Sequence, residues 1–380
     1  MMTLDERIPA LLLPWYAQNC RDLPWRADRA PYHVWLSEIM LQQTRVEAVR
    51  GYYTRFLAEL PDIAALAACP EDRLTKLWEG LGYYTRVRNL QKAARVVMDE
   101  YGGEFPQNFD DIRALPGVGD YTAGAVASIC FEKPTPAVDG NVLRVVSRLL
   151  NDHRPTDDVK LRREYRDALA DIYPAGRCGE FTQALMELGA TLCGPNSAPR
   201  CEHCPLASLC RGFADGTAAQ LPVRAAKKER RVEEKTVFVL RCDGACAVKK
   251  RGKTGLLAGL WELPNVPGLL SAQAAVEQAA RWGVQPQGLQ KSLERAHIFT
   301  HVRWQMRCYY IDCTARADGF VWADAARFAR DIALPTAFKM FWEEEREEGR
   351  RGYRRCFLRF CCCLRCVPAD WIRPRSRRMG

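Results

Sequence analysis

Apolar residues recur at three- and four-residue spacing through the first 225 positions of the chain. The clearest stretches are VWLSEIMLQQTRVEAV, YTAGAVASICF, VLRVVSRLL and EFTQALMELGATLC. This spacing puts the apolar side chains on one face of an α-helix, and Pro and Gly residues separate each stretch from the next. The pattern predicts an all-α domain over residues 1–213, which ends in a dense Cys- and Pro-rich segment.

The pattern changes after residue 235. TVFVL and ACAVKK flank Asp243-Gly244, a dipeptide typical of tight hairpin turns. SAQAAVEQAARW has the periodicity of a helix, and HIFTHVRWQMRCYYIDC predicts two strands or one bent strand. Residues 236–342 are therefore expected to form a smaller α+β domain, which a charged linker over residues 214–235 joins to the first.

The net charge of +10 is concentrated at one end of the chain. Residues 350–380 hold ten Lys or Arg residues and one Asp, so the remaining chain carries only about +1. Any case for DNA binding must therefore rest on local sites and not on global charge. Residues 343–380 also change abruptly to Arg- and Cys-rich sequence, which predicts a disordered basic tail or a frameshifted end.

The chain has seventeen cysteines and no sequence feature of a secreted or membrane protein. Acidic residues precede its short N-terminal apolar patch, where a secretory signal carries positive charge, and no apolar run approaches the roughly 20 residues that span a bilayer. We therefore expect a cytoplasmic protein, associated with the nucleoid in a bacterium. Its cysteines are expected to be reduced thiols or metal ligands.

The string Leu115-Pro-Gly-Val-Gly-Asp-Tyr-Thr-Ala123 predicts a tight hairpin between two helices. Without side chains, Gly117 and Gly119 would let a DNA phosphate approach the backbone N–H groups at the start of the second helix. An ordinary Gly-rich turn between packed helices is the alternative. The full nine-residue string and the helix after it favour a phosphate-binding hairpin.

Two carboxylates have sequence surroundings that predict opposite ionisation. Glu38 lies in the apolar stretch VWLSEIML, so burial is expected to raise its pKa, although a place on the wet face of the helix is equally compatible with the pattern. Asp139 precedes the helical stretch VLRVVSRLL, where helix N–H groups favour its ionised form, and plain capping is its commoner role. A proton donor and a carboxylate anion are the pair that cleavage of a glycosidic bond requires.

Four cysteines, Cys193, Cys201, Cys204 and Cys210, lie within 18 residues of one another. Four thiolates at such spacing can enclose either a zinc ion or an iron–sulfur cluster. The ligand type alone does not distinguish the two.

Taken together, these motifs resemble the helix-hairpin-helix DNA glycosylases that carry an iron–sulfur loop, and in particular the MutY-type adenine DNA glycosylases. The resemblance covers residues 1 to about 342 and rests on LPWR, VWLSEIMLQQTRV, EGLGYYTRVRNL, LPGVGDYTAGAV, AVDGNV and the cysteines. It implies a two-lobed helical domain, a [4Fe–4S] cluster in preference to zinc, and a monomer. It also implies removal of adenine opposite 8-oxoguanine or guanine in double-stranded DNA.

The resemblance also implies roles for individual residues. Glu38 would protonate adenine at N7 and later handle the water, and Asp139 would stabilise or briefly capture the sugar cation. Tyr121 and Asn141 would hydrogen-bond around the sugar, Asp139 and the water. Relatives that also cut the DNA backbone carry Lys where this chain has Tyr121, and a phenol cannot form their Schiff base. A monofunctional enzyme is therefore expected.

Base recognition would use a second group of residues. The resemblance implies an adenine pocket and a wedge that enters the duplex where the base leaves it. The pocket would be lined by Arg21, Trp25, Arg26 and Gln183, and the wedge would be formed by Leu41, Gln43 and Tyr83.

The chain departs from the family pattern in two places. The first gap between the cysteines is seven residues where the family usually has six, and we expect the loop to absorb the additional residue. The C-terminal domain resembles the Nudix-like domain of the family, in which Phe299-Thr300-His301 would read 8-oxoguanine. The helix after GLWELP contains only Glu277, so Nudix hydrolase activity is not expected.

Other functions fit part of this pattern. An endonuclease III-like bifunctional enzyme conflicts with Tyr121 and with the extra domain. A thymine mismatch glycosylase of the same fold also can carry Tyr there, but such relatives often lack the Glu of LSEIMLQQT. A non-catalytic, cluster-bearing DNA-binding module would bind DNA without needing either carboxylate.

Overall fold

The computed structural model describes residues 2–195, 199–224 and 229–344. The chain divides into two compact units, one built from residues 1–229 with 330–333 and the other from residues 230–329 with the chain from 334 on. The expected basic tail lies outside the described residues from position 345. No helix in the described part of the chain is both long and apolar enough to cross a lipid bilayer.

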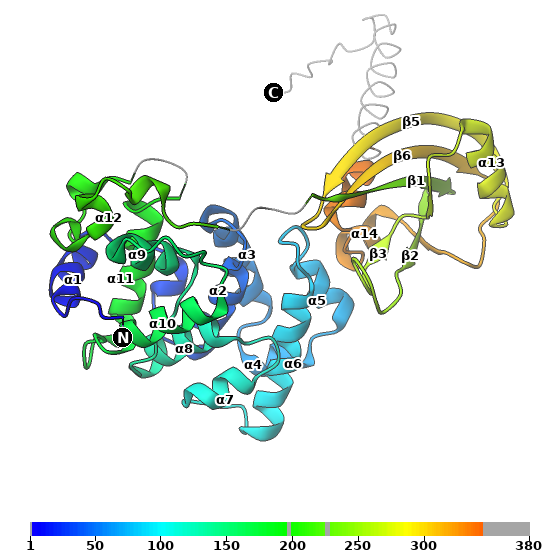
Figure 1. Cartoon of the computed structure of the whole chain (residues 1–380). Helices are drawn as coiled ribbons and strands as arrows, with labels where there is room; N and C mark the ends of the chain where they lie inside the picture. Colours follow the sequence, from blue (N-terminus) through cyan, green and yellow to red (C-terminus); the bar gives the residue numbers. More distant parts are fainter. Residues whose placement is uncertain (1, 196–198, 225–228, 345–380) are drawn as a thin grey trace, which may run out of the picture. The chain divides into compact units, whose positions relative to one another are not determined.

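The first unit is helical (Figure 1). Several helices begin at a side chain that accepts a hydrogen bond from the first turn, as Asp62, Asn108, Asp139 and Asp158 do. Its helices are α1 (Ile8–Asn19), α2 (Pro31–Leu41), α3 (Val46–Glu59), α4 (Ile63–Ala68), α5 (Glu71–Leu77), α6 (Thr85–Glu100), α7 (Phe109–Ala114), α8 (Asp120–Phe131), α9 (Gly140–Leu150), α10 (Val159–Ala170), α11 (Cys178–Thr191) and α12 (Arg211–Ala214). Short 3-10 turns occupy Pro24–Arg26, Cys201–His203, Ala207–Leu209 and Ala218–Gln220.

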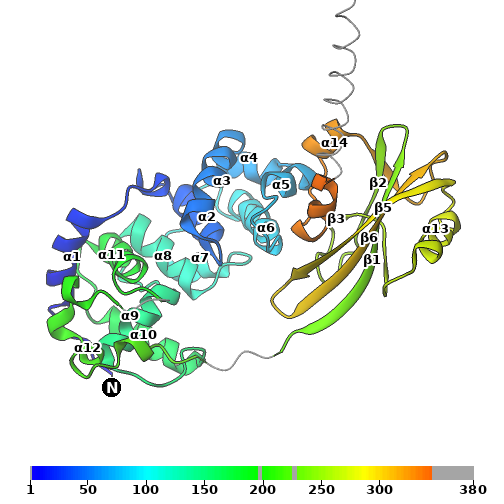
Figure 2. The same cartoon turned by 90° about the horizontal axis from the view of Figure 1, so that it is seen from above.

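These helices form two lobes. Helix α1 shares one apolar core with α9, α10 and α11, in which Leu12, Val146, Tyr165 and Phe181 are fully buried. Helices α2 to α8 form the second lobe, where α2 packs on α3, α6 and α8 (Figure 2). The chain thus leaves the first lobe after α1 and returns to it at α9, so residues far apart in sequence meet where the lobes face each other.

The second unit is a mixed sheet with helices, as expected for a Nudix-like α+β domain. Strands β1 and β6 run parallel, and the order along the sheet is β3-β2-β1-β6-β5, with β4 beside β1 and β7 beside β2. The elements are β1 (Arg231–Cys242), β2 (Ala245–Lys250), β3 (Trp261–Glu262), β4 (Asn265–Pro267), α13 (Ala272–Arg281), β5 (Pro286–Ile298), β6 (Val302–Cys313), β7 (Val321–Ala323) and α14 (Ala325–Arg330).

Both faces of this sheet are covered. Phe238 and Ile311 pack with Ala275 of α13 on one face. Tyr310 alternates with Ile311 along β6, and its hydroxyl donates to the carbonyl of Phe341 at 2.9 Å within the helical residues 336–344. The sheet therefore lies between two helical segments.

The local predictions for this unit are confirmed, with one difference at its start. Asp243 and Gly244 have positive φ angles of 47° and 73° and turn β1 into β2. Residues 297–313 contain parts of two strands. The predicted linker, however, is shorter in the structure, because β1 already begins at Arg231 and pairs with β6, where the Trp304 indole donates to Glu233 at 2.9 Å. At its other end the Arg148 guanidinium donates to the carbonyl of Leu221, which holds residues around 221 on the helical unit.

Candidate active site

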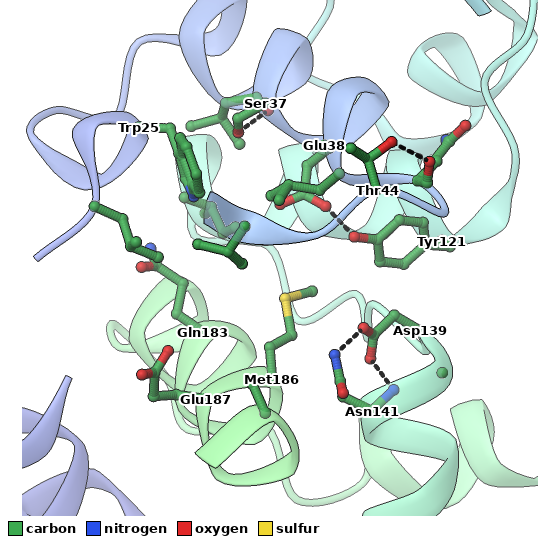
Figure 3. Close-up of a pocket in the computed structure, with 18 of the residues that line it drawn as sticks. Trp25, Ser37, Glu38, Thr44, Tyr121, Asp139, Asn141, Gln183, Met186 and Glu187 are labelled. Atoms are coloured by element: carbon green, nitrogen blue, oxygen red, sulfur yellow. Dashed lines mark hydrogen bonds between the residues drawn. The ribbon is translucent and has the colours of Figure 1, made fainter. Parts of the chain in front are cut away.

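A cavity of about 670 Å³ lies between the two lobes of the helical unit. Glu38 and Tyr121 point into it from α2 and α8, and Asp139 and Asn141 face them from the start of α9 (Figure 3). The cavity is also lined by Arg21, Trp25, Arg26, Leu41, Gln43 and Gln183. The fold thus brings ten of the residues named from the sequence to one place.

Glu38 is buried because α2 is buried on almost every side. Seven of its neighbours between Tyr32 and Met40 are also buried, and Glu38 itself is 6% exposed. Its carboxylate accepts a hydrogen bond from the Tyr121 hydroxyl. Burial raises the pKa of Glu38 to about 7, the Tyr121 hydrogen bond opposes this, and the negative charge of Asp139 adds to it. The wet-face alternative is thereby excluded, and the carboxyl can carry a proton at neutral pH.

Asp139 is the N-cap of α9, and its carboxylate accepts three hydrogen bonds. The donors are the backbone N–H groups of Asn141 at 2.9 Å and Val142 at 2.7 Å and the Asn141 side-chain amide at 2.8 Å. The expectation that these donors keep the pKa low is wrong in its net direction. Burial raises the pKa of Asp139 above its ordinary value, although all three donors and Arg144 favour the charged form. The carboxylate is held as a hydrogen-bond acceptor at the wall of the cavity.

Asn141 has its own supports. Its amide oxygen accepts a hydrogen bond from Arg144 at 2.8 Å, which orients the amide nitrogen toward Asp139. Gly189 of α11 packs directly against Asn141, where a Cβ atom at position 189 would come within 2.6 Å of the Asn141 Cβ. Close packing of α11 on α9 thus sets the position of Asn141.

Glu187 is a cavity residue that no sequence motif singled out. It is fully buried and accepts hydrogen bonds from Arg21 Nε at 2.6 Å and Arg26 Nη2 at 2.8 Å. Burial opposes its ionisation, but Arg21 and Arg26 outweigh that effect and lower the pKa of Glu187. Its signal was available, since Glu187 follows Gln183 by four residues and so lies on the same helix face. The two arginines are therefore held by a carboxylate at the wall of the cavity.

The predicted wedge residues lie on two different loops. Gln43 follows α2 with a positive φ of 56° and lines the cavity. Tyr83 lies between α5 and α6 with a φ of 47° and is 48% exposed, but it does not line the cavity.

The predicted reader segment lies in the second unit. Phe299-Thr300-His301 forms the turn between β5 and β6. The Phe299 ring makes edge-to-face contacts with the rings of His297 and Trp304.

The two glycines of the hairpin, Gly117 and Gly119, suit their positions for different structural reasons. Gly117 has a φ of +77°, and a Cβ there would lie 2.6 Å from the Cβ of Asn89. Gly119 caps α8 with an ordinary extended backbone, and the space around its Cα is open. Gly117 makes the turn possible, whereas Gly119 leaves room above the first N–H groups of α8.

This difference predicts different effects of the same substitution. Gly117→Ala should destabilise the fold by about 1–3 kcal/mol, because it adds a left-handed residue and a clash. Gly119→Ala should cost less than about 1 kcal/mol but weaken DNA binding, because its methyl group fills the open space. Thermal denaturation and anisotropy with an undamaged duplex measure the two effects. Unchanged DNA affinity in Gly119→Ala would remove the case for phosphate approach there.

The four predicted cysteine ligands surround a second, apolar cavity. Cys193, Cys201, Cys204 and Cys210 line it, and Arg148 Nη1 donates to the Cys193 sulfur at 3.1 Å. Among the described residues, no three Cys, His, Asp or Glu side chains are grouped closely enough to hold a single metal ion. Four thiols that line one apolar space are consistent with a shared metal centre.

Known proteins share both units. The model of the HhH-GPD superfamily of base excision DNA repair proteins matches residues 36–170, and that of the NUDIX domain matches residues 236–344. The adenine DNA glycosylase of Mus musculus is 36% identical over 411 residues, which cover 90% of this chain and 79% of that protein. The chain belongs to the adenine DNA glycosylase family.

Other members and a solved structure agree with this assignment. The adenine DNA glycosylase of Schizosaccharomyces pombe is 32% identical over 80% of this chain and 81% of its own length. A solved thermostable thymine-DNA glycosylase is 29% identical with a TM-score of 0.50, and it covers 55% of this chain and 97% of that protein. The match to the thymine-DNA glycosylase thus covers about half of this chain, whereas the matches to these two adenine DNA glycosylases cover 80% and 90% of it.

Proposed function

We propose that this adenine DNA glycosylase hydrolyses the N-glycosidic bond of an adenine that is extruded from a DNA duplex into the cavity. The observation that carries the proposal is the pair of carboxylates, one buried and one partly buried, that face this cavity with different hydrogen-bond partners. Glu38 receives one hydroxyl donor and has a pKa of about 7, whereas Asp139 receives three N–H donors. One can deliver a proton and the other can remain an anion.

The reaction balances with these two groups. Protonated Glu38 gives its proton to N7 of adenine, the bond between C1′ and N9 breaks, and the electron pair leaves with neutral adenine. The oxocarbenium-like sugar is stabilised by the Asp139 carboxylate, which Asn141 and the start of α9 hold in place. Water adds to C1′, and its proton returns to Glu38. Tyr121 orients Glu38 through its hydroxyl.

The rest of the cavity supplies recognition. Arg21, Arg26 and Glu187 form a charged wall whose donors and acceptors can read the edge of a base, and Trp25 offers an aromatic surface. Leu41, Gln43 and Tyr83 would enter the duplex, with the phosphate held at Gly117 and Gly119. Phe299-Thr300-His301 would read the opposite 8-oxoguanine or guanine. We also propose that the protein acts as a monomer, in the cytoplasm, on chromosomal DNA.

A panel of duplexes tests this function. The full chain is incubated with labelled duplexes that contain adenine opposite 8-oxoguanine, guanine or thymine, or thymine opposite guanine, with and without alkali. Adenine loss opposite 8-oxoguanine and guanine, with strand cuts only after alkali, is expected because Tyr121 cannot form an imine. Cleavage without alkali would contradict monofunctional chemistry, and release of thymine alone would replace the proposed substrate.

The described cysteines are consistent with a [4Fe–4S] cluster, and we propose that Cys193, Cys201, Cys204 and Cys210 hold it. Such a cluster would supply covalent closure of the loop between α11 and α12, next to Arg148 of α9. Residues 196–198, within the loop of seven between the first two cysteines, lie outside the described part of the chain.

Cys204→Ser should remove the visible iron–thiolate absorbance and most of the bound iron. The helical unit should also melt at a lower temperature, because a ligand of the closing group is lost. Iron and zinc per protein chain, measured on the purified protein, check this. Cys20→Ser is the matched control, since Cys20 is exposed and far from this loop in sequence. A colourless wild-type protein with one zinc would overturn the cluster.

A further inference from the structure

Arg86, the second residue of α6, binds the backbone of two separate loops at once. Its Nη1 donates to carbonyl oxygens at the end of α2, and its Nη2 donates to carbonyls of the loop before α6. The acceptors are Ile39 at 2.8 Å, Met40 at 3.1 Å, Gln42 at 2.6 Å, Leu81 at 3.1 Å and Gly82 at 3.2 Å. One guanidinium thus joins segments more than 35 residues apart in sequence.

The two loops are those that carry the proposed wedge. Gln43 follows directly after one acceptor of Arg86, and Tyr83 follows directly after another. Both residues have left-handed backbone angles, φ 56° for Gln43 and 47° for Tyr83, which side chains other than Gly adopt only where their surroundings enforce it. Helix α2, whose last carbonyls Arg86 caps, also carries Glu38.

The environment of Arg86 is unusual for a structural arginine. No carboxylate among the described residues forms an ion pair with it, and its guanidinium instead lies 5.3 Å from the Trp78 ring centroid and 5.6 Å from that of Tyr83. Burial lowers the pKa of Arg86 to about 10. A partly buried cation that is compensated by carbonyls and aromatic rings, without a carboxylate, has a cost in free energy. Simple capping of α2 would not require contacts to the second loop.

We propose that Arg86 is a positioning residue that sets the spacing of Gln43 and Tyr83 and thereby the extrusion of adenine from the duplex. The inference rests on the proposed function. It concerns the step before bond cleavage, since Arg86 does not line the cavity that holds Glu38 and Asp139. Lysine cannot replace Arg86, because the three donors of lysine share one nitrogen. That single nitrogen cannot bond to carbonyl groups of both loops at once, as Nη1 and Nη2 of the guanidinium do.

The test compares Arg86→Lys with Arg88→Lys, a control on the same helix whose guanidinium donates to Glu71 at 2.9 Å. The probe is a duplex in which 2-aminopurine, whose fluorescence rises on leaving the base stack, replaces the adenine opposite 8-oxoguanine. Stopped-flow fluorescence gives the extrusion rate, anisotropy gives DNA affinity, and thermal denaturation gives stability. We expect Arg86→Lys to slow extrusion about tenfold or more, with wild-type behaviour in the control.

A second arm separates positioning from a general loss of structure. In a Gln43→Ala, Tyr83→Ala background, Arg86→Lys should have no further effect on extrusion, because the groups it positions are already gone. Equal slowing in both backgrounds, or wild-type extrusion by Arg86→Lys, would overturn the proposal. Arg86→Gln is the second variant, and failure of both variants to fold would also contradict a positioning role. Absence of adenine release by the wild type would instead contradict the proposed function.

Discussion

Glu38→Gln is expected to slow adenine release by a factor on the order of 10³ at pH 7 while DNA affinity stays within about threefold of the wild type. Gln keeps the shape of the side chain and can still accept a hydrogen bond from the Tyr121 hydroxyl. It cannot deliver a proton to N7 of adenine, so the leaving group would depart as an anion. Single-turnover release measured beside a binding isotherm separates the chemical step from affinity.

The pH dependence of the wild type follows from the same group. Because the acid form is required and burial raises the pKa of Glu38 to about 7, ionisation of Glu38 should leave the single-turnover rate nearly unchanged below pH 6, until protonation of Asp139 lowers it at more acid pH. Above pH 7 it should fall about tenfold per pH unit. Bound DNA excludes more water and can move the midpoint upward, but the sign is fixed. A rate that rises with pH between 6 and 9 would assign Glu38 the role of a base in the rate-limiting step.

The raised pKa also has a cost in stability. The folded chain binds a proton at Glu38 between pH 4.5 and about 7 that the unfolded chain releases, so the free energy of unfolding falls as pH rises through this window. The loss approaches roughly 3 kcal/mol at pH 8. Glu38→Gln removes this loss. Its melting temperature should exceed that of the wild type at pH 8 and approach it near pH 4.5.

Asp139→Asn is expected to have a comparable effect through charge and not through the proton. Asn still offers one oxygen to the N–H groups of Asn141 and Val142, so the cap of α9 is largely preserved. Its amide nitrogen, however, would face the amide nitrogen of Asn141, and the anion opposite the sugar would be lost. We expect adenine release to fall by a factor on the order of 10³, because an electrostatic contact made chiefly in the transition state is removed.

A charged ligand distinguishes this role from simple capping. A duplex that carries a cationic cyclic amine in place of the deoxyribose mimics the oxocarbenium-like sugar. Wild type and Glu38→Gln should bind this duplex much more tightly than undamaged DNA, whereas Asp139→Asn should lose most of that preference. Equal preference in all three proteins would mean that Asp139 contributes structure alone.

Local sequence patterns predicted much of the fold. The apolar spacing predicted the helices, the Asp-Gly dipeptide predicted the β1–β2 turn, and Asp139 was recognised as a cap because a short acceptor before an apolar helical run has few other positions to occupy. The neighbours of Glu38 left burial and a place on the wet face of the helix equally open, and the structure shows that Glu38 is buried.

Features that depend on contacts between segments far apart in the sequence could not be predicted. The net pKa of Asp139 depends on how much of the surrounding lobe excludes water, which its own helix does not reveal. Glu187 is held by Arg21 and Arg26, which lie 166 and 161 residues earlier in the chain. Strand β1 begins in charged residues because β6 supplies partners such as Trp304, although the charges by themselves indicated a linker. The contacts of Arg86 could not be predicted for the same reason, because its acceptors are backbone carbonyl groups of distant segments.

The most direct test of the account is the release of free adenine from a duplex with adenine opposite 8-oxoguanine, with enzyme in excess and at pH 7. Wild type, Glu38→Gln and Asp139→Asn are compared at concentrations that saturate binding of each. We predict one adenine released per duplex by the wild type, with no strand cut before alkali, and release slower by a factor on the order of 10³ in both variants. Wild-type release by either variant, or no adenine from the wild type, would contradict the account.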